Sequence, residues 1–91
     1  STLGGIANWE FLQVLFLDDN HLEVLPPDIS NLRRLKKFHI NRNQLKAIPS
    51  EIGDLKELTE LRARDNQIES ISARIGELSK LESIDLSNNL L

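Results

Sequence analysis

The sequence predicts an α/β solenoid, in which short parallel strands and short helical segments alternate along a stack of similar units. The first observation is a period: apolar positions recur every 23 residues, beginning with Leu12, Leu35, Leu58 and Leu81. The second is an identical polar column in the same register, Asn20, Asn43, Asn66 and Asn89. Self-similarity at a fixed period of this length is the sequence signature of a repeat architecture.

Each unit reads L-x-x-L-x-L-x-x-N-x-L-x-x-L-P-x-x-I-x-x-L-x-x. The L-x-L stretch has a period of two, which predicts a short strand with its apolar side chains on one face. Stacking the units places these strands side by side and parallel. We therefore expect one buried column to contain Leu15, Phe38, Leu61 and Ile84.

The second half of each unit has a different spacing. Its I-x-x-L-x-x-L pattern has a period of three, which favours a helical turn or a 3₁₀ segment. Pro26 and Pro49 precede this part in two units, and proline has no N–H for a ladder hydrogen bond. In the third unit Ser72 stands in the place of the proline.

The motif L-x-x-L-x-L-x-x-N-x-L recurs in register, and the return segment L-P-x-x-I-x-x-L accompanies it, as in Leu25 to Leu32. Together these residues resemble the leucine-rich repeat, in its intracellular 23-residue class. Ras-group scaffold proteins, Scribble-type polarity proteins and bacterial effectors share that class. The resemblance covers nearly the whole chain. It implies a horseshoe-shaped solenoid with a concave parallel β-sheet and short 3₁₀ or helical segments on the convex side.

We expect a single leucine-rich repeat segment spanning residues 1–91. By register, residues 1–11 are a partial N-terminal repeat, the full repeats are 12–34, 35–57 and 58–80, and residues 81–91 are a truncated repeat. Terminal units need polar capping faces. No such cap is evident, so apolar residues of the last unit should be exposed: Leu81, Ile84, Leu86 and Leu91.

Composition excludes several functional classes. The formal net charge is −3, which gives no basic footprint for nucleic acid or for an anionic membrane. Cysteine is absent, which excludes disulfides, thiolate metal sites and cysteine nucleophiles. No apolar run approaches the ~20 residues that span a bilayer. The lack of cysteine-rich caps and of N-x-S/T sequons indicates an intracellular, cytoplasmic location.

Candidate catalytic groups lack their partners. His21 and His39 are isolated in the register, without a neighbouring nucleophile or a set of metal ligands. The adjacent carboxylates Asp18 and Asp19 are expected to face water. The asparagine column is expected to satisfy backbone groups in the turns, because an amide both donates and accepts hydrogen bonds. We therefore expect no enzyme activity, metal or cofactor.

The outward, concave side of the strands is the surface that could bind a partner. It mixes both signs of charge, which suits recognition of a protein and disfavours a phosphate backbone. Val14 and Phe16 add an apolar corner, and an exposed aromatic residue near an arginine is typical of binding hot spots. The candidate partner-binding residues are Val14, Phe16, Asp18, Lys37, His39, Asn41, Arg42, Arg62, Arg64 and Asp85.

The favoured function is a protein–protein interaction module that binds through this concave face. The Ras-group resemblance implies a small GTPase or another signalling protein as a partner. Two alternatives stay open: a substrate-targeting segment of a larger enzyme or effector, and a fragment that self-associates end to end. Charged residues of the return segments alternate in sign and are expected only to maintain solubility: Arg33, Arg34, Lys36, Asp54, Lys56, Glu57, Arg74, Glu77 and Lys80.

Overall fold

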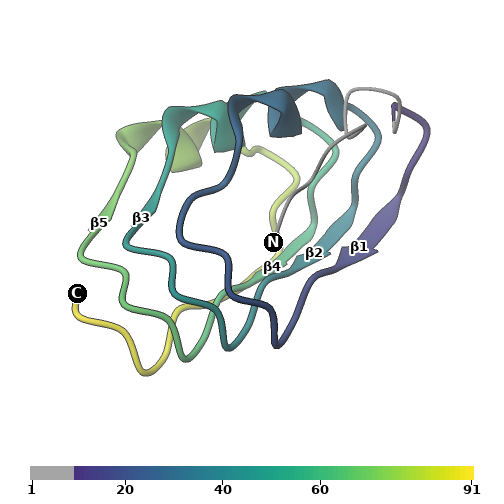
Figure 1. The fold of residues 1–91 in the computed structure, drawn as a ribbon. Helices are drawn as coiled ribbons and strands as arrows, with labels where there is room; N and C mark the ends of the chain where they lie inside the picture. Colours follow the sequence, from purple (N-terminus) through teal and green to yellow (C-terminus); the bar gives the residue numbers. More distant parts are fainter. Residues whose placement is uncertain (1–9) are drawn as a thin grey trace.

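One three-residue strand from each unit contributes to a parallel sheet along one side of the stack (Figure 1). The computed structural model describes residues 10–91. Val14 is paired with Lys37, Lys37 with Glu60, and Glu60 with Ser83, so the register is 23 residues throughout, as predicted. The strands, in spatial order, are β1 (Val14–Phe16), β2 (Lys37–His39), β4 (Glu60–Arg62) and β6 (Ser83–Asp85).

The predicted return segments are 3₁₀ helices of five residues each, η2 (Pro27–Asn31), η3 (Ser50–Asp54) and η4 (Ala73–Glu77). They form the top of the stack in Figure 1, and η3 packs between the other two. At the C-terminus of each helix, the leucine that follows it donates its N–H to the carbonyl of an isoleucine within the helix. In η2 this bond joins Leu32 to Ile29.

A second, two-stranded sheet was not expected. It pairs β3 (Ala47–Ile48) with β5 (Ser70–Ile71) on the flank opposite the main sheet (Figure 1). Its cause is the substitution of Ser72 for proline, because the Ser72 N–H donates to the Ile48 carbonyl at 3.0 Å. The Ser72 hydroxyl also accepts a hydrogen bond from the Arg74 N–H and so caps η4. Pro49, at the equivalent position one unit earlier, has no N–H to donate.

The core consists of the inward strand residues and the apolar residues of the 3₁₀ segments. Phe38 and Leu61 are fully buried, which confirms the predicted column. At its two ends, Leu15 is 9% exposed and Ile84 is much more exposed. In the C-terminal unit Ile84 and Leu91 are 44% and 65% exposed, as expected, whereas Leu81 and Leu86 are half-buried because they pack against the core. The predicted N-terminal partial repeat, residues 1–11, lies outside the described residues except for its last two positions. The largest fully buried side chains are Phe38, Ile29, Leu32, Leu35, Ile40, Leu45, Ile48, Ile52, Leu55, Leu58 and Leu61.

The asparagine column has the structural role that the sequence predicts. Asn43 Nδ2 donates to the carbonyls of Leu17 at 3.0 Å and Ile40 at 3.1 Å, and its Oδ1 accepts the N–H of Leu22 at 3.2 Å. Asn43 therefore bonds both its own turn and the turn of the preceding unit. The same set of bonds is repeated at Asn66 and Asn89. Within residues 10–91 no buried side-chain nitrogen or oxygen lacks a hydrogen-bond partner.

Candidate protein-binding surface

The outward side chains of the main sheet, together with the residues that directly follow its strands, are called the sheet surface below. Its N-terminal corner is apolar: Val14 is 44% and Phe16 57% exposed on β1. The Phe16 ring stacks against the imidazole of His39 on β2, with centroids 4.3 Å apart and an angle of 18° between the rings. The stacking holds the Phe16 ring against β2 although more than half of the residue is exposed.

Polar contacts link His39 to two residues of the next strand, Glu60 and Arg62 on β4. His39 Nε2 is hydrogen bonded to Glu60 Oε2, and Arg62 Nε lies 3.5 Å from the same oxygen. The pKa of the Glu60 carboxyl is lowered, first by the hydrogen bond from His39 and then by the charges of Arg62 and Lys37, against the opposing effect of desolvation. Glu60 was not among the candidate residues, although the register pairs it with Lys37 on the same face of the sheet.

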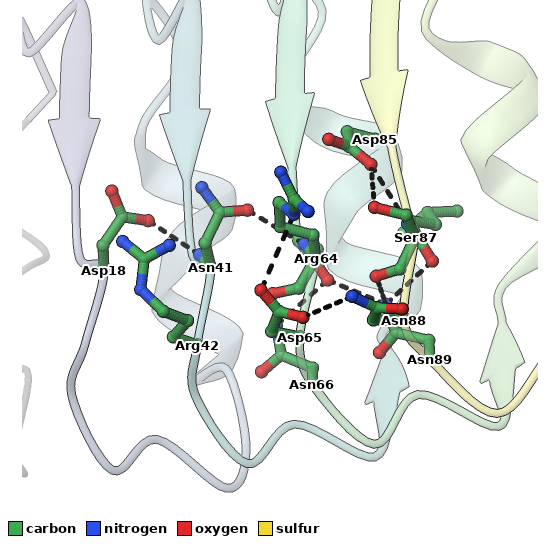
Figure 2. A network of polar contacts seen from close by, with 12 residues as sticks. Asp18, Asn41, Arg42, Arg64, Asp65, Asn66, Asp85, Ser87, Asn88 and Asn89 are labelled. Carbon is green, nitrogen blue, oxygen red and sulfur yellow. Dashed lines mark hydrogen bonds and ion pairs between the residues drawn. The ribbon is translucent and has the colours of Figure 1, made fainter.

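The next row of the sheet surface is mainly structural (Figure 2). Asp18 Oδ1 accepts the backbone N–H of Asn41 at 2.7 Å, and Asn41 Oδ1 accepts that of Arg64 at 2.9 Å. Asn41 is only 8% exposed. The structure therefore corrects the expectation that Asn41 presents its side chain to solvent, because its amide is used to join adjacent units.

This series of hydrogen bonds between units ends at Arg64, because a guanidinium has no acceptor atom for the N–H of the next unit. The N–H of Ser87 is accepted instead by Asp85 Oδ1 from its own strand, at 3.0 Å, and the Ser87 hydroxyl donates to the same oxygen at 2.7 Å (Figure 2). These two bonds, assisted by Arg64 and Arg62, lower the pKa of Asp85. The side chain of Arg64 is left on the surface, 3.6 Å from Asp65.

The residues that follow Asp18, Asn41, Arg64 and Ser87 lie in the turns after the strands. Asp19, Arg42, Asp65 and Asn88 all have φ between 55° and 60°, the left-handed region. Arg42 was expected on the strand face, but it lies in the turn that follows β2. There it is bonded to Asp19 through Nε at 2.5 Å and Nη2 at 3.0 Å, which lowers the pKa of Asp19. Asp and Asn tolerate this conformation better than other non-glycine residues, which explains three of these four positions.

The structure thus brings Phe16, His39 and Arg62 together with Lys37, which is exposed on β2 and makes no ion pair with any described residue. Among residues 10–91, no group of three His, Cys, Asp or Glu side chains could hold a metal ion. None of the helices in that range has the length and apolar character needed to cross a bilayer. His21 is exposed, as expected, just after the turn that follows β1.

A family model described as "Leucine-rich repeat region" matches residues 4–89. The chain belongs to the leucine-rich repeat family. Similar solved structures include a leucine-rich repeat protein of Leptospira interrogans, with 34% identity, a TM-score of 0.92, and coverage of 96% of this chain and 22% of that one. An internalin of Listeria monocytogenes has 26% identity, a TM-score of 0.82, and coverage of 98% and 26%.

This leucine-rich repeat chain therefore spans about a quarter of the length of those two proteins. No curated protein shows significant sequence similarity to it. Leucine-rich repeat proteins commonly mediate protein–protein interactions and are generally binding modules without enzymatic activity.

Proposed function

We propose that this chain is a non-enzymatic interaction module and that its sheet surface, on the concave side, binds a partner protein. One observation supports this most directly: an exposed phenylalanine, Phe16, is fixed by stacking on His39. A side chain that is already fixed loses little conformational entropy when it binds. Arg62 lies in the same row, and aromatic and arginine residues are enriched among those that contribute most to binding.

The charges of the sheet surface support a partner with matched chemistry. Asp19, Glu60 and Asp65 are paired with Arg42, Arg62 and Arg64 on the surface, so the charges of these three acidic side chains are compensated. The partner would place an apolar side chain on Val14 and Phe16 and acceptor groups near Lys37 and Arg62. A small GTPase or another signalling protein in the same intracellular compartment is the partner class that the family resemblance suggests.

The test compares the wild type with Phe16→Ala and Arg62→Ala. Partners are first identified by affinity capture from lysate, and the dissociation constant of each is then measured with purified protein. We expect either substitution to weaken binding by about 1–4 kcal/mol. Val24→Ala is the control, because Val24 is 73% exposed but lies outside the main sheet. Equal affinities for the wild type and the Phe16→Ala/Arg62→Ala double variant would exclude the sheet surface.

A second candidate is a substrate-targeting segment of a larger enzyme or effector. It is favoured by the length of the two similar proteins, because this chain covers only 22% of one and 26% of the other. In that case the chemistry would lie in another domain of the larger protein. The open reading frame around Ser1 and Leu91 tests it: a catalytic domain in the same frame would support targeting, and its absence would exclude it.

A third candidate is end-to-end self-association. It is favoured by apolar side chains exposed on the last unit, where Ile84 is 44% and Leu91 65% accessible. The mass in solution, measured by light scattering over a range of concentrations, tests it. A monomer at the highest concentration would exclude self-association, and an Ile84→Asp variant that dissociates a dimer would support it.

A further inference from the structure

The basic residues of this chain are not distributed evenly once ion pairs are taken into account. Six of the eleven Lys and Arg residues form ion pairs with carboxylates. Within residues 10–91, which include all eleven, the other five have no carboxylate within 4.0 Å. Four of these five lie in one stretch of five residues: Arg33, Arg34, Lys36 and Lys37, and the fifth is Lys46.

These four residues, called the basic edge below, lie after η2: three are in the segment that leads to β2, and Lys37 is the first residue of β2. All four are exposed. The sequence pattern predicted a return surface of alternating sign that serves only solubility. The structure agrees for the pairs Lys56–Glu77, Arg74–Asp54 and Lys80–Glu57. It differs for the basic edge, where the positive charges have no such compensation.

Three carboxylates that lie near the basic edge, on Asp54, Glu57 and Glu60, are already bonded to other basic side chains. Glu57 is bonded through both its oxygens to Lys80, at 2.9 Å each. Glu60, which is paired with Lys37 in the sheet register, is held by His39 and Arg62. Glu10 precedes Arg33 by one 23-residue unit and forms no ion pair with it. Each of these acids would have to leave an existing partner, or move, to neutralise the basic edge.

The basic edge also has a shape that could receive a side chain. Gln13, Arg33, Arg34, Lys36 and Glu57 line a shallow hollow of about 440 Å³. Beside it the Arg34 guanidinium lies 4.6 Å from the centre of the Phe11 ring, which is itself 64% exposed. The hollow therefore combines the donors of Arg33, Arg34 and Lys36 with one carboxylate, that of Glu57, which is already bonded to Lys80.

We propose that the basic edge binds an acidic segment of the partner protein, with a carboxylate side chain in the hollow between Arg33 and Lys36. This deepens the proposed function, on which it rests, by giving the chemistry of the partner. Four exposed cations on a chain of net charge −3 suit a short run of Asp or Glu better than a long polyanion, which the rest of the surface would repel.

The experiment uses a labelled octapeptide of alternating Glu and Ala, with the Gln and Ala peptide as its neutral counterpart. Binding to the purified 91-residue chain is followed by fluorescence anisotropy at low and at physiological salt. We expect binding of the Glu peptide alone, weakened by salt, and weakened roughly three- to tenfold by Arg33→Glu or by Lys36→Glu.

Lys46→Glu is the matched control, because it makes the same change in net charge at the one unpaired cation outside the basic edge. Lys46 directly precedes β3, on the opposite flank (Figure 1). Val24→Ala, at an exposed residue outside both surfaces, should leave peptide binding unchanged. The peptide assay needs no partner protein, which separates this test from that of the sheet surface. No binding of the Glu peptide, or an equal loss in Lys46→Glu, would overturn the proposal. Stronger binding of an eight-nucleotide oligothymidine or of phosphatidylserine vesicles would assign the basic edge to another class of ligand and overturn it as well.

Discussion

Gly53 lies directly against Arg74 of the next unit. A Cβ atom built on Gly53 would be 2.8 Å from both Cβ and Nε of Arg74. That arginine donates from Nη2 to Asp54 at 2.7 Å, from Nε to Glu77 at 3.1 Å and from Nη1 to the Ser50 carbonyl at 3.0 Å. The absence of a side chain at Gly53 is therefore what allows η3 and η4 to be joined by this arginine.

We expect Gly53→Ala to lower the free energy of unfolding by about 1–3 kcal/mol, because the added methyl group must displace Arg74. Gly76 is the matched control, since a Cβ there meets nothing within 4 Å. Gly76→Ala should be neutral or raise stability by about 0.4–1 kcal/mol through the unfolded state. Urea unfolding followed by circular dichroism measures both. Equal stabilities of the two variants would contradict the close approach described above.

The asparagine column gives a second matched pair. Asn66 Nδ2 donates to Ile40 and Ala63, at 2.9 and 3.0 Å, and its Oδ1 accepts from Leu45 at 3.1 Å. Asn66→Ala leaves these buried backbone groups without partners and should cost about 1–3 kcal/mol or more. Asn20 bonds only within its own unit among the described residues, so Asn20→Ala should cost less. A loss at Asn20 as large as at Asn66 would show that the bonds between units add little.

Ser72 allows a test of the second sheet. Ser72→Pro removes both the N–H donated to Ile48 and the hydroxyl that caps η4, although the φ of −59° suits proline. We expect a loss of about 1–3 kcal/mol. Ser72→Ala removes only the cap and should cost about 0.5–2 kcal/mol. If the proline variant is at least as stable as the alanine variant, the bond to Ile48 contributes no stability.

The free energy of unfolding at acidic pH should depend on Glu60. Its pKa is lowered in the folded chain by His39, Arg62 and Lys37, from an ordinary value of 4.5. A lowered pKa contributes stability that is present above the unfolded-state pKa and is lost as the pH falls through the folded-state pKa. We expect the free energy of unfolding to decrease as the pH is lowered below about 4.5, and Glu60→Gln to make that decrease smaller.

The control for this experiment is Glu69→Gln, which removes an exposed carboxylate that forms no ion pair with the described residues. It should leave the pH dependence close to that of the wild type. The lowered pKa values of Asp19, Glu77 and Asp85 act in the same direction, so part of the acid dependence will persist in Glu60→Gln. Identical profiles for the wild type and the Glu60 variant would show that its pairing with His39 does not affect folding.

The features that repeat were predictable from sequence, because a period imposes the same environment on each member of a column. Strand register, the buried column at Phe38 and the role of Asn43 all follow from that argument. The features that depart from the repeat could not be predicted from a residue's position in the repeat alone. Nothing in a two-residue period shows that Ser72 adds a strand pair, or that Arg42 has left the strand for a left-handed turn.

The candidate surface was predictable only as a set of neighbouring residues. Register places Phe16, His39 and Arg62 in one row, and the structure confirms that arrangement. Which charges are compensated depends on side-chain conformation, and sequence does not specify it. For this reason Asn41 was expected to be free but is used within the fold, whereas Arg33 and Lys36 were expected to be balanced but are not.

The bonds of the asparagine column also give the array a direction. Asn43 Oδ1 accepts a hydrogen bond from the backbone N–H of Leu22, in the unit before it, and Asn66 Oδ1 accepts one from that of Leu45. A turn is therefore completed only by the unit that follows it. During synthesis, the N–H of Leu22 can donate only to water until a further 21 residues have left the ribosome and Asn43 is in place, as their separation requires. Assembly of this protein should consequently proceed one unit behind translation.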